Sequence, residues 1–161
     1  MVAKGGAPLL AEDAVAVLKD RLLPLARLAT PNIPEAEALL GHAVSGPEDM
    51  EAAARALRDL GPEAVLLKGG HLEGDVLVDI LADEDGIERY QGPRIDTPHT
   101  HGTGCTLASA VAAGLAQGLD LRSAVARARA YVAKAIATAP GLGGGHGPLN
   151  HGHTVAPFEG D

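Results

Sequence analysis

Residues 94–105 read Arg-Ile-Asp-Thr-Pro-His-Thr-His-Gly-Thr-Gly-Cys, and this stretch ends an extended segment and opens a helical pattern near Thr103. Gly102 and Gly104 let the backbone turn tightly and approach a ligand closely. The amides of the first helical turn point outward with the positive end of the helix dipole behind them, an arrangement that binds anions. A single G-x-G also serves many strand-to-helix turns for steric reasons alone. Cys105, the single cysteine of the chain, lies in the same turn.

Length and composition limit the classes of function. A chain of 161 residues can build one domain with a real core, and its 46% apolar but only 2% aromatic residues predict a core of Ala, Val, Leu and Ile. The formal charge of −8 argues against nucleic acid or an anionic membrane as a partner. A single cysteine excludes an intramolecular disulfide and fits a reducing cytosol, so we expect a cytoplasmic protein.

Hydrophobic periodicity predicts alternating helices and strands. This alternation favours a layered α/β structure with a mainly parallel sheet. A capping box is expected at Ser45-Gly46-Pro47-Glu48. Helices are predicted over residues 12–25, 34–40, from 45 to 61, from 103, and from 120 to 140; strands are predicted over 27–30, 64–67, 75–81 and 86–94.

Three loops that follow predicted strands carry polar or glycine residues. They hold Asn32 and Glu35, then Lys68 to His71, and then Gly102 to Cys105. In open α/β sheets, ligands bind outside the carboxyl ends of the strands. We therefore expect the three loops to converge on one crevice.

Each candidate residue also has a plainer interpretation. Lys68 can place its ammonium on a phosphate, or simply lie at a strand end before a glycine turn. Asn32 and Glu35 can order a magnesium ion and its waters, or only cap their helix. Cys105 can act in catalysis, alone or as a nucleophile paired with His101, or pack as a small residue in the first turn.

The seven histidines suggest a metal site, and three of them, His146, His151 and His153, lie in a glycine-rich tail. Structural zinc usually takes cysteine ligands as well. With one cysteine in the chain, the sequence gives little support for a dedicated zinc site.

Four segments resemble, in order, the motifs of bacterial hydroxymethylpyrimidine/phosphomethylpyrimidine kinases of thiamine biosynthesis, which belong to the ribokinase-like superfamily. The resemblance implies a ribokinase-like three-layer α/β/α fold with a mainly parallel sheet. It also implies ATP- and Mg²⁺-dependent phosphorylation of a hydroxymethylpyrimidine and then of its monophosphate. The segments are Thr-Pro-Asn-Ile-Pro-Glu-Ala (30–36), Leu-Lys-Gly-Gly-His (67–71), Thr-His-Gly-Thr-Gly-Cys-Thr (100–106) and Gly-His-Gly-Pro-Leu-Asn-His (145–151).

By resemblance, each motif has a role at the site. Asn32 and Glu35 would position Mg²⁺ and water, and Lys68 with Gly69 and Thr100 would contact ATP. Gly102, Thr103 and Gly104 would form the anion hole, and Cys105 would stand where most ribokinase-like enzymes carry an aspartate base. The resemblance further implies a homodimer for the full-length enzyme.

In the resembling kinases, the stretch similar to residues 1–6 follows a sizeable N-terminal portion that makes most contacts to the pyrimidine. We therefore expect residues 1–140 to be the C-terminal, nucleotide-binding part of a kinase domain, followed by a Gly/His-rich tail over 141–161. Such a fragment should have little activity alone, since positioning of the acceptor supplies about 7–11 kcal/mol of barrier lowering. The alternatives are a pyridoxal-type vitamin kinase and a non-catalytic nucleotide-binding module or subunit.

Overall fold

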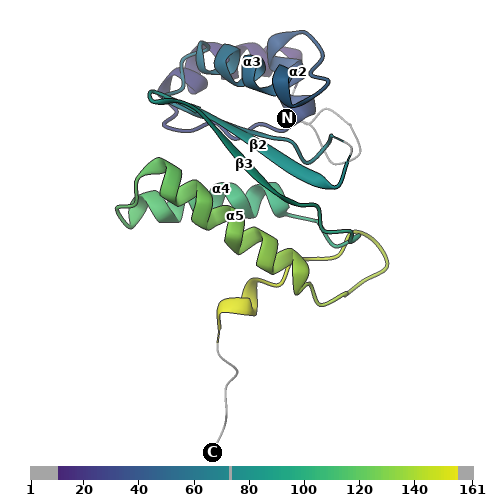
Figure 1. Ribbon diagram of the computed structural model, residues 1–161. Helices are drawn as coiled ribbons and strands as arrows, with labels where there is room; N and C mark the ends of the chain where they lie inside the picture. The colour runs from purple at the N-terminus through teal and green to yellow at the C-terminus, as the bar shows by residue number, and fades with distance from the viewer. Residues whose placement is uncertain (1–10, 73, 156–161) are drawn as a thin grey trace, which may run out of the picture. The chain divides into compact units, whose positions relative to one another are not determined.

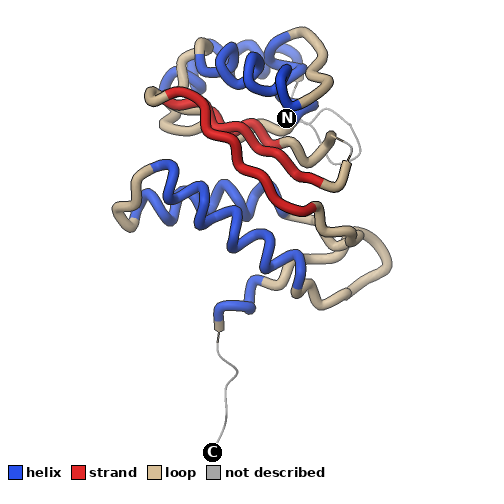
Figure 2. The backbone as a smooth tube through the Cα atoms, in the orientation of Figure 1, coloured by secondary structure: helices blue, strands red, loops and turns tan. Residues whose placement is uncertain are grey.

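A computed structural model describes residues 11–72 and 74–155 of the chain. The start of the predicted nucleotide-binding part (residues 1–10) and the end of the predicted tail (156–161) lie outside this range. The chain forms two compact units, residues 1–94 and 95–161 (Figures 1 and 2). In the described residues, every helix is too short or too polar to cross a membrane.

The helix predicted over residues 12–25 is present but changes its pitch along its length. It consists of α1 (Glu12–Val17), the π-helical turn η1 (Leu18–Leu22) and the 3-10 turn η2 (Leu23–Leu25). The tighter last turn contains Pro24, which cannot donate a backbone hydrogen bond. Two further helices follow, α2 (Ile33–Leu40) and α3 (Pro47–Arg58). Helix α2 stops at Gly41, which adopts the left-handed conformation with φ 79°.

The first unit contains the strands β1 (Val65–Lys68), β2 (Val76–Asp83) and β3 (Gly86–Pro93), in that order and antiparallel throughout. The prediction of a mainly parallel sheet is therefore wrong for these strands. The reason is the length of the connections: residues 69–75 join β1 to β2, and residues 84–85 join β2 to β3. A parallel return needs a crossover of about a dozen residues or more.

Parallel pairing does occur on the other side of β1. The predicted strand 27–30 appears as isolated parallel bridges, in which Ala29 pairs with Val65 and Asn32 with Lys68. The amide of Leu66 donates to the Ala29 carbonyl at 2.8 Å. This segment and β1 are connected through α2 and α3, which is the long helical crossover that a parallel pair requires.

The core of the first unit lies between its helices and the sheet. Met50 and Leu57 project from α3 and are 0% and 2% exposed. They belong to one cluster with Val65 and Leu67 of β1 and Ile80 of β2. The strand predicted over 64–67 is confirmed, and its continuous apolar run is fully buried. The helices α2 and α3 are seen together beside the strands in Figure 1.

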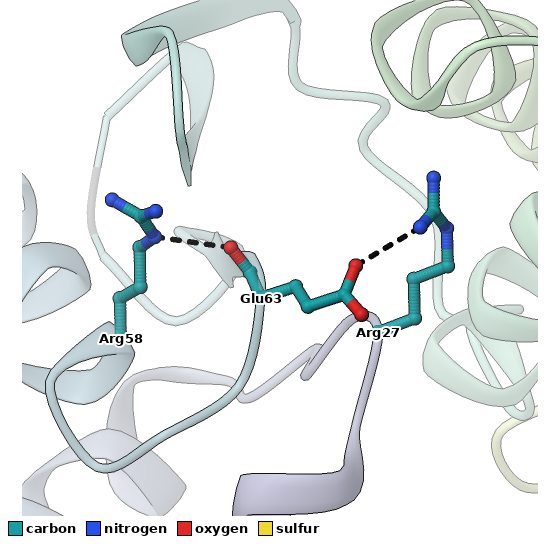
Figure 3. A network of polar contacts seen from close by, with 3 residues as sticks. All are labelled: Arg27, Arg58 and Glu63. Atoms are coloured by element: carbon teal, nitrogen blue, oxygen red, sulfur yellow. Dashed lines mark hydrogen bonds and ion pairs between the residues drawn. The ribbon is translucent and has the colours of Figure 1, made fainter.

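The turn that leads into β1 is held at the surface by polar contacts (Figure 3). Glu63 accepts from Arg27 Nη1 at 2.9 Å, and its carbonyl accepts from Arg58 Nε at 3.0 Å. The Arg27 and Glu63 side chains are 64% and 69% exposed, so this ion pair contributes little to stability. The Arg58 bond ties the end of α3 to the turn before β1, and the ion pair joins the same turn to the segment at Arg27.

The second unit is a pair of packed helices, α4 (Thr103–Ala116) and α5 (Leu121–Ala137), followed by the 3-10 turn η3 (His151–Thr154). The predicted helix start near Thr103 is confirmed. Gly114 of α4 is buried, and a Cβ there would lie 2.9 Å from the Cβ of Ala124 in α5. The backbone of the tail joins this unit where the Asn150 amide donates to the Ala135 carbonyl at 3.0 Å.

We predict that Gly69→Ala destabilises the first unit. A Cβ at Gly69 would lie 2.0 Å from the backbone oxygen of Val78, and a backbone atom cannot swing aside. The expected loss is about 1–3 kcal/mol in the free energy of unfolding, measured by urea denaturation. Gly92→Ala in β3 is the matched control, because a Cβ at Gly92 would meet nothing within 4 Å. Equal midpoints for the two variants would contradict this packing.

Candidate functional site

The start of α2 carries a complete capping box. Asn32 is the N-cap, and its Oδ1 accepts from the Glu35 amide at 2.9 Å. Glu35 Oε2 in turn accepts from the Asn32 amide at 2.9 Å. Both residues therefore cap their helix, as the plainer interpretation of the sequence predicted. One capping bond leaves a carboxylate with further acceptor capacity, since it has two oxygens and about four lone-pair sites.

The capping box predicted at Ser45 and Glu48 is wrong. Gly46 is the N-cap of α3 and Pro47 begins the helix, so Glu48 comes one position too early for a capping box. Asp49 occupies the third helical position instead, and its Oδ2 accepts from the Ser45 amide at 3.0 Å. Proline at the first helical turn decided where this helix starts.

Two of the three predicted loops come together in the first unit. The Lys68 amide donates to the Pro31 carbonyl at 2.9 Å, and Lys68 forms a parallel bridge with Asn32. The end of β1 and the start of α2 therefore lie at one edge. Lys68 is half-buried at this edge.

Asp79 is a buried acid at this edge that the sequence analysis missed. It lies directly opposite Lys68 in the register of β1 and β2, and it is 4% exposed. Its Oδ1 accepts from the Gly69 amide at 3.0 Å. A carboxylate inside the apolar run of residues 76–82 was the signal that could have found it. Two features of the structure therefore account for Gly69, apart from its predicted contact with ATP. A side chain there would collide with the Val78 carbonyl oxygen, and its amide binds Asp79.

The loop after Lys68 borders an open recess of about 380 Å³. Its walls come from the loop, the start of α3 and the first residues of β2. The loop itself is held by Arg94, which the sequence analysis did not single out as a site residue. The lining residues are Ser45, Gly46, Pro47, Gly69, His71, Leu72, Val76 and Val78.

In the second unit, the glycine turn opens α4 as predicted. Gly102 is the N-cap with φ 82°, a left-handed conformation that favours glycine. Its carbonyl accepts from both the amide and the hydroxyl of Thr106 at 2.8 Å, and the Thr103 hydroxyl donates to the Thr100 carbonyl at 2.7 Å. In the part of the chain that the structure describes, no side chain caps α4, and the amides of Gly104 and Cys105 donate to no acceptor. Unused amides at a helix start suit an anion.

The tail motif holds this turn from its other side. The His101 amide donates to the Gly147 carbonyl at 3.3 Å, and His101 forms a parallel bridge with Pro148. His99 packs so closely on Gly147 that a Cβ there would lie 2.2 Å from its Nδ1. The part of the tail around Gly147 is therefore a structural support of the turn.

Cys105 is exposed at the first turn of α4. Within residues 11–72 and 74–155, no hydrogen bond joins Cys105 to His101, so the structure does not form the Cys-His pair considered from the sequence. The same residues contain no group of three or more His, Cys, Asp or Glu side chains that could hold a metal ion.

Comparison with known proteins decides the family. Residues 1–150 match the family model described as phosphomethylpyrimidine kinase. The chain belongs to the phosphomethylpyrimidine kinase family. It is 58% identical over 151 residues to the thiamine biosynthesis bifunctional protein ThiED of Geobacter sulfurreducens, covering 94% of this chain and 31% of that protein. It is 47% identical over 155 residues to the hydroxymethylpyrimidine/phosphomethylpyrimidine kinase of Haemophilus influenzae, covering 94% and 58%.

Solved structures show the ribokinase-like α/β fold of this family. The pyridoxal kinase of Staphylococcus aureus, in complex with AMP-PCP, aligns with a TM-score of 0.87 at 32% identity, over 96% of this chain and 57% of that one. The phosphomethylpyrimidine kinase of Clostridium difficile aligns with a TM-score of 0.72 at 38% identity, over 84% and 54%. The chain thus spans about a third to three fifths of the length of these relatives. The convergence of all three loops on one crevice stays a prediction.

We predict that the two capping residues respond differently to substitution. Asn32→Ala removes the acceptor for the Glu35 amide and should cost about 1 kcal/mol of unfolding free energy. Glu35→Gln should change that free energy by less than about 0.5 kcal/mol, because glutamine also completes a capping box. Urea denaturation of both variants measures the difference. An Asn32→Ala variant as stable as the wild type would contradict the assigned cap.

Proposed function

We propose that the enzyme containing this chain transfers the γ-phosphoryl group of ATP to 4-amino-5-hydroxymethyl-2-methylpyrimidine and then to its monophosphate, in thiamine biosynthesis. The observation that carries the proposal is the family match over residues 1–150. The relatives named as kinases of these pyrimidines support it at 43–49% identity. The glycine turn at the start of α4 supports a phosphate-binding role for this part of the enzyme.

Each unit offers groups that suit a phosphate. The amides of the Gly102–Gly104 turn offer hydrogen bonds to anionic oxygens, and Thr103 and Thr100 shape that turn. Lys68 offers an ammonium, and Gly69 lets the loop pass close to β2. Groups of this kind neutralise charge on a transferring phosphoryl group, which is the main demand of phosphoryl transfer.

Mg²⁺ would be ordered near the Asn32 and Glu35 cap. The donor set fits this ion, since one carboxylate and one amide oxygen at a helix start can hold metal-bound water while phosphate oxygens complete the shell. When bound, the ion would neutralise charge on the β- and γ-phosphates. The cap itself fixes the two side chains in place before any nucleotide arrives.

Cys105 would accept the proton of the substrate hydroxyl. Its thiol is exposed beside the unused amides of the first turn of α4, where a transferring phosphoryl group would lie. Phosphoryl transfer needs a group near the attacking hydroxyl, with no covalent intermediate on the protein. The single cysteine agrees with a reducing, cytoplasmic setting. The family resemblance suggests that the complete enzyme is a homodimer.

A second candidate is a pyridoxal-type kinase. It is favoured by the structures of pyridoxal kinases, including the Bacillus subtilis ADP complex, which aligns with a TM-score of 0.84 at 35% identity. Both functions transfer a phosphoryl group from ATP, and they differ in the small molecule that accepts it. The substrate separates them.

We predict that the complete enzyme phosphorylates hydroxymethylpyrimidine with a higher kcat/KM than pyridoxal, in an assay that couples ADP release to NADH oxidation. Cys105→Ala should lower kcat about 10²–10⁴-fold, the usual contribution of a general base. Its affinity for Mg-ATP, measured by calorimetry, should stay near that of the wild type, because the amides of the turn remain.

Three outcomes would contradict this assignment. Preference for pyridoxal would replace the proposed substrate with the second candidate. Full turnover in Cys105→Ala would remove the proton acceptor. Phosphate trapped on Cys105, detected by mass spectrometry, would replace it with covalent catalysis.

A further inference from the structure

The loop that follows Lys68 is held by one arginine from outside it. Arg94 donates from Nη1 to the Gly70 carbonyl at 3.0 Å, from Nη2 to the Leu72 carbonyl at 2.5 Å, and from Nε to the Gly74 carbonyl at 2.7 Å. Its backbone amide adds a bond to the Asp75 carbonyl at 2.8 Å. Four donors of a single residue therefore hold the connection between β1 and β2.

Only arginine can make the side-chain part of this contact. A guanidinium presents five N–H donors in a rigid plane, whereas an ammonium on a flexible stem cannot reach three separated carbonyls at once. Arg94 follows Pro93 at the end of β3, and Pro93 is in register with Val76 at the start of β2. The sheet thus fixes the base of the arginine side chain next to the loop.

The beginning of the same loop has a second anchor. Asp79 is buried in β2 opposite Lys68 and accepts the Gly69 amide. Lys68 is therefore followed by a loop whose first amide is held by a carboxylate and whose next carbonyls are held by a guanidinium. The contact with Arg94 also changes the local charge of the loop. Carbonyl oxygens carry partial negative charge, and those bound to Arg94 are neutralised by a cation instead of facing an incoming phosphate.

We propose that Arg94 is a positioning residue for nucleotide binding, which fixes the loop after Lys68 in its binding form before the phosphates arrive. The inference rests on the proposed function, because it takes Lys68 as the phosphate ligand. Arg94 acts through the loop and touches no phosphate itself, since its guanidinium is engaged by the three carbonyls. Ordering the loop in advance keeps that entropic cost out of the binding step.

The test uses the complete enzyme in four forms: wild type, Arg94→Lys, Arg89→Lys and Lys68→Ala. Arg94→Lys keeps the charge and loses the three-carbonyl contact. Arg89→Lys is the matched control, since Arg89 lies on β3, the strand that ends just before Arg94, is exposed, and pairs with Glu51 instead of the loop. Calorimetry measures the affinity for Mg²⁺ with AMP-PCP, and hydrogen exchange measures the opening of the peptide that spans residues 69–75.

We expect Arg94→Lys to speed exchange in that peptide and to weaken nucleotide binding about tenfold, as when one or two residues must be ordered on binding. The KM for ATP should rise more than kcat falls, because the catalytic groups are intact. Arg89→Lys should change none of these quantities. Lys68→Ala should weaken binding without faster exchange.

Weaker binding in Arg94→Lys with unchanged exchange would overturn the inference and make Arg94 a direct ligand. Faster exchange with unchanged affinity would also overturn it, because the loop would then have no part in binding. Failure of the proposed function is seen separately. If Lys68→Ala binds as tightly as the wild type, Lys68 is no phosphate ligand and the positioning role falls with it, while the exchange rates still report whether Arg94 holds the loop.

Discussion

The parallel backbone pairing between residues 26–32 and β1 determines where the functional groups of the first unit lie. Its hydrogen bonds include Ala29 amide to Ala64 carbonyl at 3.0 Å and Lys68 amide to Pro31 carbonyl at 2.9 Å. Because the paired segments run in the same direction, both deliver their next residues to one edge. One segment continues into the Asn32 cap and the other into Lys68. The helices α2 and α3 close the connection and supply the core that buries β1.

In the second unit, the glycine turn at the start of α4 is held in place while its amides stay available. Its glycine turn must expose backbone amides while staying rigid, and in the described residues its hydrogen-bond support comes from threonine hydroxyls and the backbone of the tail. Close packing of His99 on Gly147 fixes that support. A turn that uses its side chains for its own structure leaves its amides for a ligand.

Local patterns predicted the elements well and the strand directions less well. The Asn32 to Gly41 helix, the buried strand at 65–68 and the helix start at Thr103 each carry a cap, an apolar run or a glycine that acts over a few residues. The antiparallel order of β1, β2 and β3 was also present in the sequence, in connections too short for a crossover, but it was outweighed by the alternation of helices and strands.

The role of Arg94 could not be predicted because its partners are distant in the chain. Arg94 binds backbone carbonyls that lie 20 to 24 residues earlier, and a carbonyl has no sequence signature. The cap predicted at Ser45 was wrong for a local reason, because Pro47 begins the helix and makes Gly46 the N-cap. Asn32 fits because Ile33 and Pro34 place Glu35 at the third helical position.

The central claim is that the amides of the Gly102–Gly104 turn, at the start of α4, bind phosphate of the nucleotide. The most direct measurement follows the amide resonances of the ¹⁵N-labelled complete enzyme while Mg²⁺ and AMP-PCP are added. The account predicts that the amides of Gly104 and Cys105 shift, with the dissociation constant that calorimetry gives for the nucleotide. Amides of Gly104 and Cys105 that keep their resonances at saturating nucleotide would contradict it.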